Sequence, residues 1–154
     1  MRLVFLVVGR LKAGPERDIV DEYVKRATPV ARSLGFRGIE EIEVASGGGL
    51  DAEADRILSK IPAGAKCLRL DEFGRSYRST EFAEKLAVWR DQGAPDLVLL
   101  IGGAEGYGEA VRHAVPDMMA FGPQTWPHRL VRAMLAEQVY RAVSILAGTP
   151  YHKA

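Results

Sequence analysis

The stretch DLVLLIGGAEGYGEAV, residues 96–111, decides the fold of this chain. Leu97 to Ile101 is the most apolar run in the sequence, which predicts a strand buried on both faces at the centre of a parallel sheet. Glycines follow at positions 102, 103, 106 and 108 and lead into a helix, so a ligand could approach backbone N–H groups there. A plain strand-to-helix turn is the alternative, because the spacing matches neither the dinucleotide pattern G-x-G-x-x-G nor a phosphate loop.

Strands and helices are predicted to alternate along the rest of the chain. Apolar or alternating runs predict further strands over residues 3–8, 39–45, 65–70 and 118–121. Helical spacing of apolar residues predicts helices that start at Pro15, near residue 51 and near residue 79. The alternation indicates an α/β fold in which a mostly parallel sheet carries helices on both faces, as one domain over residues 1–154.

Helix-breaking and capping residues set the expected ends of these elements. Pro29 should end or kink the first helix, and Asp51 and Ser79 should cap the second and third. The polar segment EFGRSYRS, residues 72–79, is expected to form a loop after the third strand. The strand over residues 39–45 alternates with glutamates, so we expect it near an edge of the sheet.

Composition excludes several classes of function. A formal net charge of +1 over 154 residues means that a nucleic-acid partner must be recognised through a local patch rather than through bulk charge. The single cysteine, Cys67, excludes an internal disulfide and a cysteine-based metal site, and the three histidines lack ligand spacing, so no metal is expected. The opening MRLVFLVVG is too short for a membrane span and lacks a signal-peptide cleavage pattern, so we expect a cytoplasmic protein with no membrane partner.

A long helix is predicted over residues 129–147, and its apolar positions spread wider than the roughly 100° stripe of a surface helix. Part of this surface could face the sheet and part another protomer, which suggests a symmetric homodimer. A helix buried within one monomer is the alternative. Arg132 falls inside the apolar arc, where an unpaired cation is costly, so it needs a carboxylate or phosphate partner and is a candidate for function. Arg141 can pair with Glu137 one turn earlier.

Two polar segments flank this helix. The loop before it, PQTWPH at residues 123–128, is stiffened by two prolines and ends at His128, which could be catalytic or could serve as a structural hydrogen-bonding group. After the helix, Tyr151, His152 and Lys153 combine stacking, hydrogen bonding and charge, which suits an unstacked RNA base and its phosphate. A frayed terminus is the alternative for this tail.

Several of these segments together resemble a known family. LLIGGAEG, TWPHRLVR, EQVYRA and PYHK, with the opening MRLVFLVVGRLK and the central LDEFGRSYRSTEFA, are similar to the RlmH family of SPOUT-class methyltransferases, which modify pseudouridine in large-subunit ribosomal RNA. The resemblance covers essentially the whole chain. It implies an α/β domain with a C-terminal trefoil knot, an obligate homodimer, S-adenosylmethionine as methyl donor, and methylation at N3 of a pseudouridine in 23S ribosomal RNA on the assembled ribosome.

The resemblance also implies which residues form the site. The cofactor contacts of the family fall on Leu70, Gly103, Pro123, Gln124, Thr125, Trp126, Pro127 and His128. Trp126 replaces the smaller Leu or Phe expected there, so a backbone contact should be kept while the pocket wall differs.

Methyl transfer to N3 requires that its proton leave, which a general base or a nearby cation would assist. The candidates are Arg132, His128, Tyr151 and His152, with bound water as the alternative. Three other functions are weighed against this one: a knotted methyltransferase of transfer RNA, a non-enzymatic ribosome-binding factor, and a nucleotide-dependent oxidoreductase domain. The last lacks the G-x-G-x-x-G turn that it requires.

Overall fold

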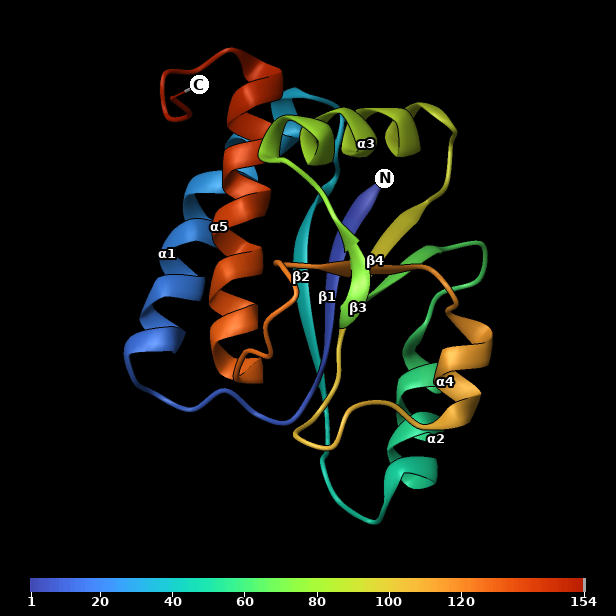
Figure 1. Cartoon of the computed structure of the whole chain (residues 1–154). Coiled ribbons are helices and arrows are strands. Elements are labelled where there is room, and N and C mark those ends of the chain that lie inside the picture. The colour runs from blue at the N-terminus through green and yellow to red at the C-terminus, as the bar shows by residue number, and fades with distance from the viewer. Residues whose placement is uncertain (154) are drawn as a thin grey trace.

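Strands and helices alternate along residues 1–153, the part of the chain that the computed structural model describes (Figure 1). The strands are β1 (Arg2–Val8), β2 (Gly38–Val44), β3 (Lys66–Ser76), β4 (Asp96–Ile101) and β5 (Met118–Ala120). The helices are α1 (Pro15–Ser33), α2 (Leu50–Lys60), α3 (Ser79–Asp91), α4 (Glu109–Ala114) and α5 (His128–Ala147). The predicted α/β alternation is confirmed.

The sheet has the strand order β2-β1-β4-β3-β5, and every neighbouring pair is parallel. Strand β4 lies at the centre, as its apolar sequence predicts, and all six of its residues are buried. Strand β2, with its alternating glutamates, lies at an edge, as predicted. Because all strands run the same way, the loops that follow them gather at one end of the sheet.

Helices cover both faces of the sheet, which makes a three-layer sandwich (Figure 1). Leu3, Phe5 and Val7 of β1 face the layer of α1, α3 and α5, whereas the alternate residues of the same strand face α2 and α4. Side chains of a strand point alternately to its two faces, so the continuous apolar run of β1 is explained by burial on both.

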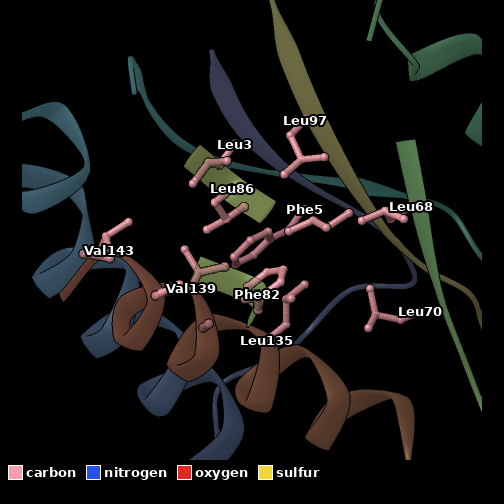
Figure 2. Packing of buried hydrophobic residues seen from close by; sticks show 14 of the residues in the cluster. Leu3, Phe5, Leu68, Leu70, Phe82, Leu86, Leu97, Leu135, Val139 and Val143 are labelled. Atoms are coloured by element: carbon pink, nitrogen blue, oxygen red, sulfur yellow. The ribbon is translucent and has the colours of Figure 1, made fainter. Parts of the chain in front are cut away.

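The larger core lies between the sheet and helices α3 and α5, as Figure 2 shows. Its labelled side chains come from five strands and helices that are distant in sequence: Leu3 and Phe5 from β1, Leu68 and Leu70 from β3, Phe82 and Leu86 from α3, Leu97 from β4, and Leu135, Val139 and Val143 from α5. Burying a side chain of this size contributes roughly 1.5–3 kcal/mol. The core therefore fixes α5 along its length against the sheet.

Helix α1 continues past Pro29, so the predicted end at this residue is wrong. A proline inside a helix lacks the N–H that would bond the carbonyl four residues earlier, here that of Lys25. Both Pro29 and Lys25 are exposed, which leaves this carbonyl on the solvent side of the helix. Ala27 and Ala31, on the opposite side, are fully buried, and their packing keeps the last turn helical.

The predicted helix caps are also wrong. Asp51 lies inside α2, which begins after Gly49 without a side-chain cap. Ser79 is the first residue of α3, and its hydroxyl donates to the Gln138 side chain of α5 at 2.8 Å instead of capping α3. The Glu81 carboxylate accepts the N–H of Arg78, the residue just before α3, at 3.0 Å.

Strand β3 extends to Ser76 through most of the segment predicted as a polar loop. The added part pairs with β5 after a register shift between Leu70 and Arg75. A Cβ atom on Gly74 would lie 2.7 Å from the backbone of Met119, so only glycine allows the two strands this close. The correction matters for function because it brings residues 71–76 beside the loops that follow β4 and β5.

Candidate functional site

A cleft of about 660 Å³ opens where β4 ends, beside the middle of β3. Six of the eight residues predicted to hold the cofactor line it: Leu70, Gly103, Gln124, Thr125, Trp126 and His128. Pro123 and Pro127, from the same loop, are not among its lining residues. The structure thus brings together segments that are more than fifty positions apart in sequence, at the sheet end where parallel α/β folds bind ligands.

The glycine turn after β4 forms one wall of the cleft. The Gly106 N–H donates to the Gly103 carbonyl at 3.0 Å, and Gly106 has a φ of +83°, a backbone angle that glycine adopts without strain. A Cβ atom on Gly102 would lie 3.0 Å from the Gly106 carbonyl oxygen and 3.0 Å from the Tyr107 ring. Packing and backbone angle therefore both require small residues here.

Gly103 is the point where loops from three strands meet. A Cβ atom on Gly103 would lie 3.2 Å from Val8, the last residue of β1, and 3.6 Å from the Glu53 carboxylate of α2. The same carboxylate accepts the N–H of Gly47, in the loop after β2, at 2.9 Å. Gly103 also lines the cleft, and its lack of a side chain lets these groups pack closely against its backbone.

Tyr107 is a buried polar residue of the cleft that sequence reasoning missed. Its hydroxyl oxygen accepts the N–H of Gly102 at 3.0 Å and lies 2.7 Å from the Leu70 carbonyl and 2.9 Å from the Leu100 carbonyl. Burial raises the pKa of this phenol, so it stays protonated and can donate to either carbonyl. The signal available in the sequence is an aromatic side chain within a glycine turn.

Arg69, also missed, places a paired charge next to the cleft. Its guanidinium, 6% exposed, donates to the carbonyls of Arg112 and Val115 at the end of α4. Its Nε lies 3.5 Å from the Asp71 carboxylate, and its guanidinium carbon lies 5.8 Å from the centre of the Tyr107 ring. Arg69 therefore ties α4 to β3 behind the cleft.

The Pro-His loop before α5 is fastened to β3 and to the residue that follows β5. The Thr125 hydroxyl donates to the Glu72 carboxylate in the extended part of β3. Trp126 donates its indole N–H to the Phe121 carbonyl at 2.9 Å, while its ring lines the cleft and remains 38% exposed. Trp126 thus forms part of the wall, where a difference from the family was expected.

His128, the first residue of α5, is exposed and lines the cleft. Its imidazole makes no hydrogen bond to any residue among 1–153, so the structural hydrogen-bonding alternative finds no partner there. The ring is available to a ligand in the cleft.

Arg132, one turn further along α5, is engaged elsewhere. It is 3% exposed, and its guanidinium lies 2.7 Å from the Glu43 carboxylate, 3.1 Å from that of Glu41 and 3.2 Å from the Gly9 carbonyl oxygen. The carboxylate partner that its burial requires is therefore present. Burial opposes ionisation of Glu43, but the N–H of Leu11 and the Arg132 guanidinium outweigh it and lower the pKa of Glu43.

The tail, residues 151–153, begins docked against α5, which contradicts the frayed alternative for its first two residues. The Tyr151 ring centre lies 4.5 Å from that of Tyr140, and the Arg141 guanidinium carbon lies 4.8 Å from the Tyr151 ring centre. His152 Nδ1 lies 3.1 Å from an Arg141 nitrogen, and Arg141 also bonds Glu137 at 2.9 Å, as predicted.

The four candidate catalytic residues are not brought together within one chain. His128 is the first residue of α5 and lines the cleft, whereas Tyr151 and His152 follow the other end of this helix, where Figure 1 marks the C-terminus. A helix of 20 residues is about 30 Å long. Arg132 is buried between them and does not line the cleft. The tail and the cleft of the same protomer therefore cannot act on one substrate atom.

Two further features bear on the class of protein. Within residues 1–153, no group of three or more His, Cys, Asp or Glu side chains is arranged to hold a metal ion. Over the same residues, no helix is long and apolar enough to cross a membrane.

Comparison with known proteins gives matches along the whole chain. A family described as "Predicted SPOUT methyltransferase" matches residues 1–152. The protein named ribosomal RNA large subunit methyltransferase H from Hyphomonas neptunium is 64% identical over 154 residues, covering 100% of both chains. Proteins of the same name from Xanthobacter autotrophicus and Dinoroseobacter shibae are 50% and 48% identical, covering 100% and 99% of each chain.

Solved structures match more distantly. A methyltransferase from Legionella pneumophila, solved with S-adenosylmethionine, is 12% identical with a TM-score of 0.49 and covers 92% of this chain and 66% of its own. Structural similarity at this TM-score does not indicate function. The family is shown instead by the full-length sequence matches, so the chain belongs to the SPOUT methyltransferases, in the family of the ribosomal RNA large subunit methyltransferases H.

Proposed function

We propose that the protein transfers the methyl group of S-adenosylmethionine to N3 of a pseudouridine in 23S ribosomal RNA, on the assembled ribosome in the cytoplasm. The observation that carries the proposal is that residues from the middle of β3, the glycine turn and the loop before α5 line one cleft. Its support is the full-length identity of 64% to a protein named for methylation of large-subunit ribosomal RNA.

The residues of the cleft fit an adenosyl ligand. Such sites combine apolar walls with a few fixed polar groups, often from the backbone. Leu70, Ile101 and Met119 supply apolar surface, and Gly103, which has no side chain, lets a ligand approach its backbone. Gln124 and Thr125 supply polar side chains on the opposite wall. S-adenosylmethionine supplies a methyl carbon bound to a positively charged sulfur, which a nucleophile can displace.

The role of the chain is to align the nucleophile and to handle its proton. Alignment in a closed site supplies much of the rate of such displacements. His128 is our candidate for accepting the N3 proton, because it is the one of the four candidates that is exposed and lines the cleft. Arg132 is proposed to act indirectly, by holding α5 against the loop after β1 through Glu43 and Gly9.

A homodimer would bring the remaining candidates into the site. We propose that Tyr151 and His152 of one protomer complete the cleft of the other, because the length of α5 separates them from their own cleft. A hollow of about 370 Å³ lies between β5, the start of α3 and the middle of α5, and it is lined mainly by apolar side chains. Phe73 and Leu130 are also exposed, at 81% and 39%, as expected of apolar side chains that a second protomer would cover. We also propose that the C-terminal third of the chain is tied in a trefoil knot.

The decisive experiment is methyl transfer from labelled S-adenosylmethionine to four substrates: intact ribosomes, isolated large subunits, free 23S ribosomal RNA and transfer RNA. We expect label on the large-subunit RNA of intact ribosomes, mapped by mass spectrometry to one pseudouridine. Label on transfer RNA alone would indicate the rival knotted methyltransferase. Binding to ribosomes without any transfer would indicate a non-enzymatic binding factor.

A further inference from the structure

Tyr107 joins the middle of β3 to the end of β4, the two strands that border the cleft. Its hydroxyl contacts one backbone group of β3, the Leu70 carbonyl at 2.7 Å, and two at the end of β4, the Leu100 carbonyl at 2.9 Å and the Gly102 N–H at 3.0 Å. Leu70 and Gly102 both line the cleft, and Gly102 directly precedes Gly103, which lines it too. One side-chain oxygen therefore links the start of the glycine turn to the backbone of both strands.

The position of this oxygen is itself fixed by packing. The Tyr107 side chain is buried, and a Cβ atom on Gly102 would lie 3.0 Å from its ring. The Arg69 guanidinium carbon lies 5.8 Å from the centre of the same ring and is held in turn by the end of α4. The phenol has little freedom to move, so the groups it bonds are also held in place.

Gly102 depends on the hydroxyl for its hydrogen bond. Gly102 is buried, and its N–H donates to Tyr107. A buried N–H that loses its acceptor is costly and tends to move until water reaches it. Loss of the hydroxyl should therefore loosen the start of the glycine turn rather than the sheet beneath it, whose strands keep their own ladder bonds.

We propose that Tyr107 is a positioning residue for the cofactor: its hydroxyl holds the Gly102 N–H and the Leu70 carbonyl at the separation that an S-adenosyl ligand requires. The proposal rests on the proposed function, because it names what one buried side chain does for the same cleft. It assigns Tyr107 no contact with the reacting atoms.

The test is the variant Tyr107→Phe in the full-length protein, which removes one oxygen and keeps the ring. We expect the Kd for S-adenosylhomocysteine, measured by calorimetry, to rise about tenfold, because a buried donor loses its partner. With ribosomes as substrate, KM for S-adenosylmethionine should rise in parallel, while kcat at saturating cofactor stays within about twofold.

A matched control separates positioning from general loss of stability. Trp89 is buried in α3, outside the lining of the cleft, so Trp89→Phe should lower the thermal midpoint and leave the Kd unchanged. Hydrogen exchange gives a second readout: in Tyr107→Phe the amide of Gly102 should exchange at least about tenfold faster, while those of β4 keep their protection.

The outcomes are distinguishable. An unchanged Kd together with unchanged exchange at Gly102 would overturn the proposal, and so would an equal loss of affinity in Trp89→Phe. If the wild-type protein bound no S-adenosylhomocysteine, the proposed function would fail instead, and the exchange of Gly102 would still decide whether the hydroxyl holds the turn.

Discussion

Gly102 and Gly103 are required by their neighbours rather than by their backbone angles. Neither has a positive φ, in contrast to Gly106, yet a Cβ atom at either position would lie 3.0–3.2 Å from another residue. The sequence pattern could predict a glycine turn at a strand end. It could not predict Tyr107, because the two carbonyls and the N–H that its hydroxyl contacts come together only when β3 and β4 lie side by side.

The first prediction at the residue scale concerns Gly103→Val. The valine side chain would meet Val8 and Glu53 and displace the glycine turn that lines the cleft, so we expect binding of S-adenosylmethionine to become undetectable by calorimetry. Ala13→Val, at an exposed position in another loop, is the control and should bind normally. Unchanged affinity in Gly103→Val would refute the assignment of Gly103 to the cofactor site.

The second prediction at this scale is that Glu43 contributes to the pH dependence of stability in acid. The folded-state pKa of Glu43 lies below its ordinary value of 4.5, so the unfolded state binds more protons in this range. The contribution of Glu43 is therefore fully present above pH 4.5 and is lost as the pH falls through the lower, folded-state pKa. We expect the urea midpoint of Glu43→Gln to fall less steeply with decreasing pH in this acidic range than that of the wild type. Glu84→Gln, at an exposed position, should follow the wild type.

At the scale of elements, pattern succeeded where the local sequence and the tertiary contacts agree. Strand β4 could be predicted because burial on both faces requires an apolar residue at almost every position. The extension of β3 was missed because its residues are polar and its pairing depends on Gly74 lying against β5. The predicted helix end at Pro29 was wrong for a similar reason, because tertiary packing of the buried side of α1 keeps the helix going past a proline.

A prediction at this scale follows from Pro29. Replacing it by alanine supplies the missing N–H for the Lys25 carbonyl in a helix that already continues past this residue. We expect Pro29→Ala to raise the free energy of unfolding by about 1–3 kcal/mol, measured in urea. Pro62→Ala, just outside α2, should give no such gain. A loss of stability in Pro29→Ala would show that the proline shapes the end of α1.

At the scale of the whole molecule, α5 decides which parts of the site can meet. Resemblance to the family predicted eight cofactor-binding residues, and the structure places six of them around one cleft. Sequence could not show that His128 and Tyr151 lie at opposite ends of a 20-residue helix. That separation is a property of the folded chain, and it leads directly to the proposed exchange of tails between protomers.

Truncation after Thr149 tests this proposal. The tail docks on Tyr140 and Arg141, far along α5 from the cleft, so the Kd for S-adenosylmethionine should not change. Methyl transfer to ribosomes should fall by at least about a hundredfold, because the proposed second half of the site is absent. Full activity of the truncated protein would remove the tail from the mechanism.

Complementation then shows which protomer supplies the tail. The truncated chain and Gly103→Val should each be inactive alone, whereas their heterodimer would combine one intact cleft with one intact tail. With random pairing of co-expressed chains, we expect about a quarter of the wild-type activity. No recovery, in a preparation shown to contain heterodimers, would place each tail with its own cleft.

The single unbroken helix α5 has a consequence for how such a protein can change in length. Each residue of a helix advances the chain by about 1.5 Å and turns it by about 100°. One residue added in the middle of α5 would swing everything beyond it to another side, taking the aromatic tail away from its target and the apolar stripe away from the sheet. Insertions and deletions in natural relatives should therefore accumulate in surface turns and spare this helix, even where its individual side chains vary.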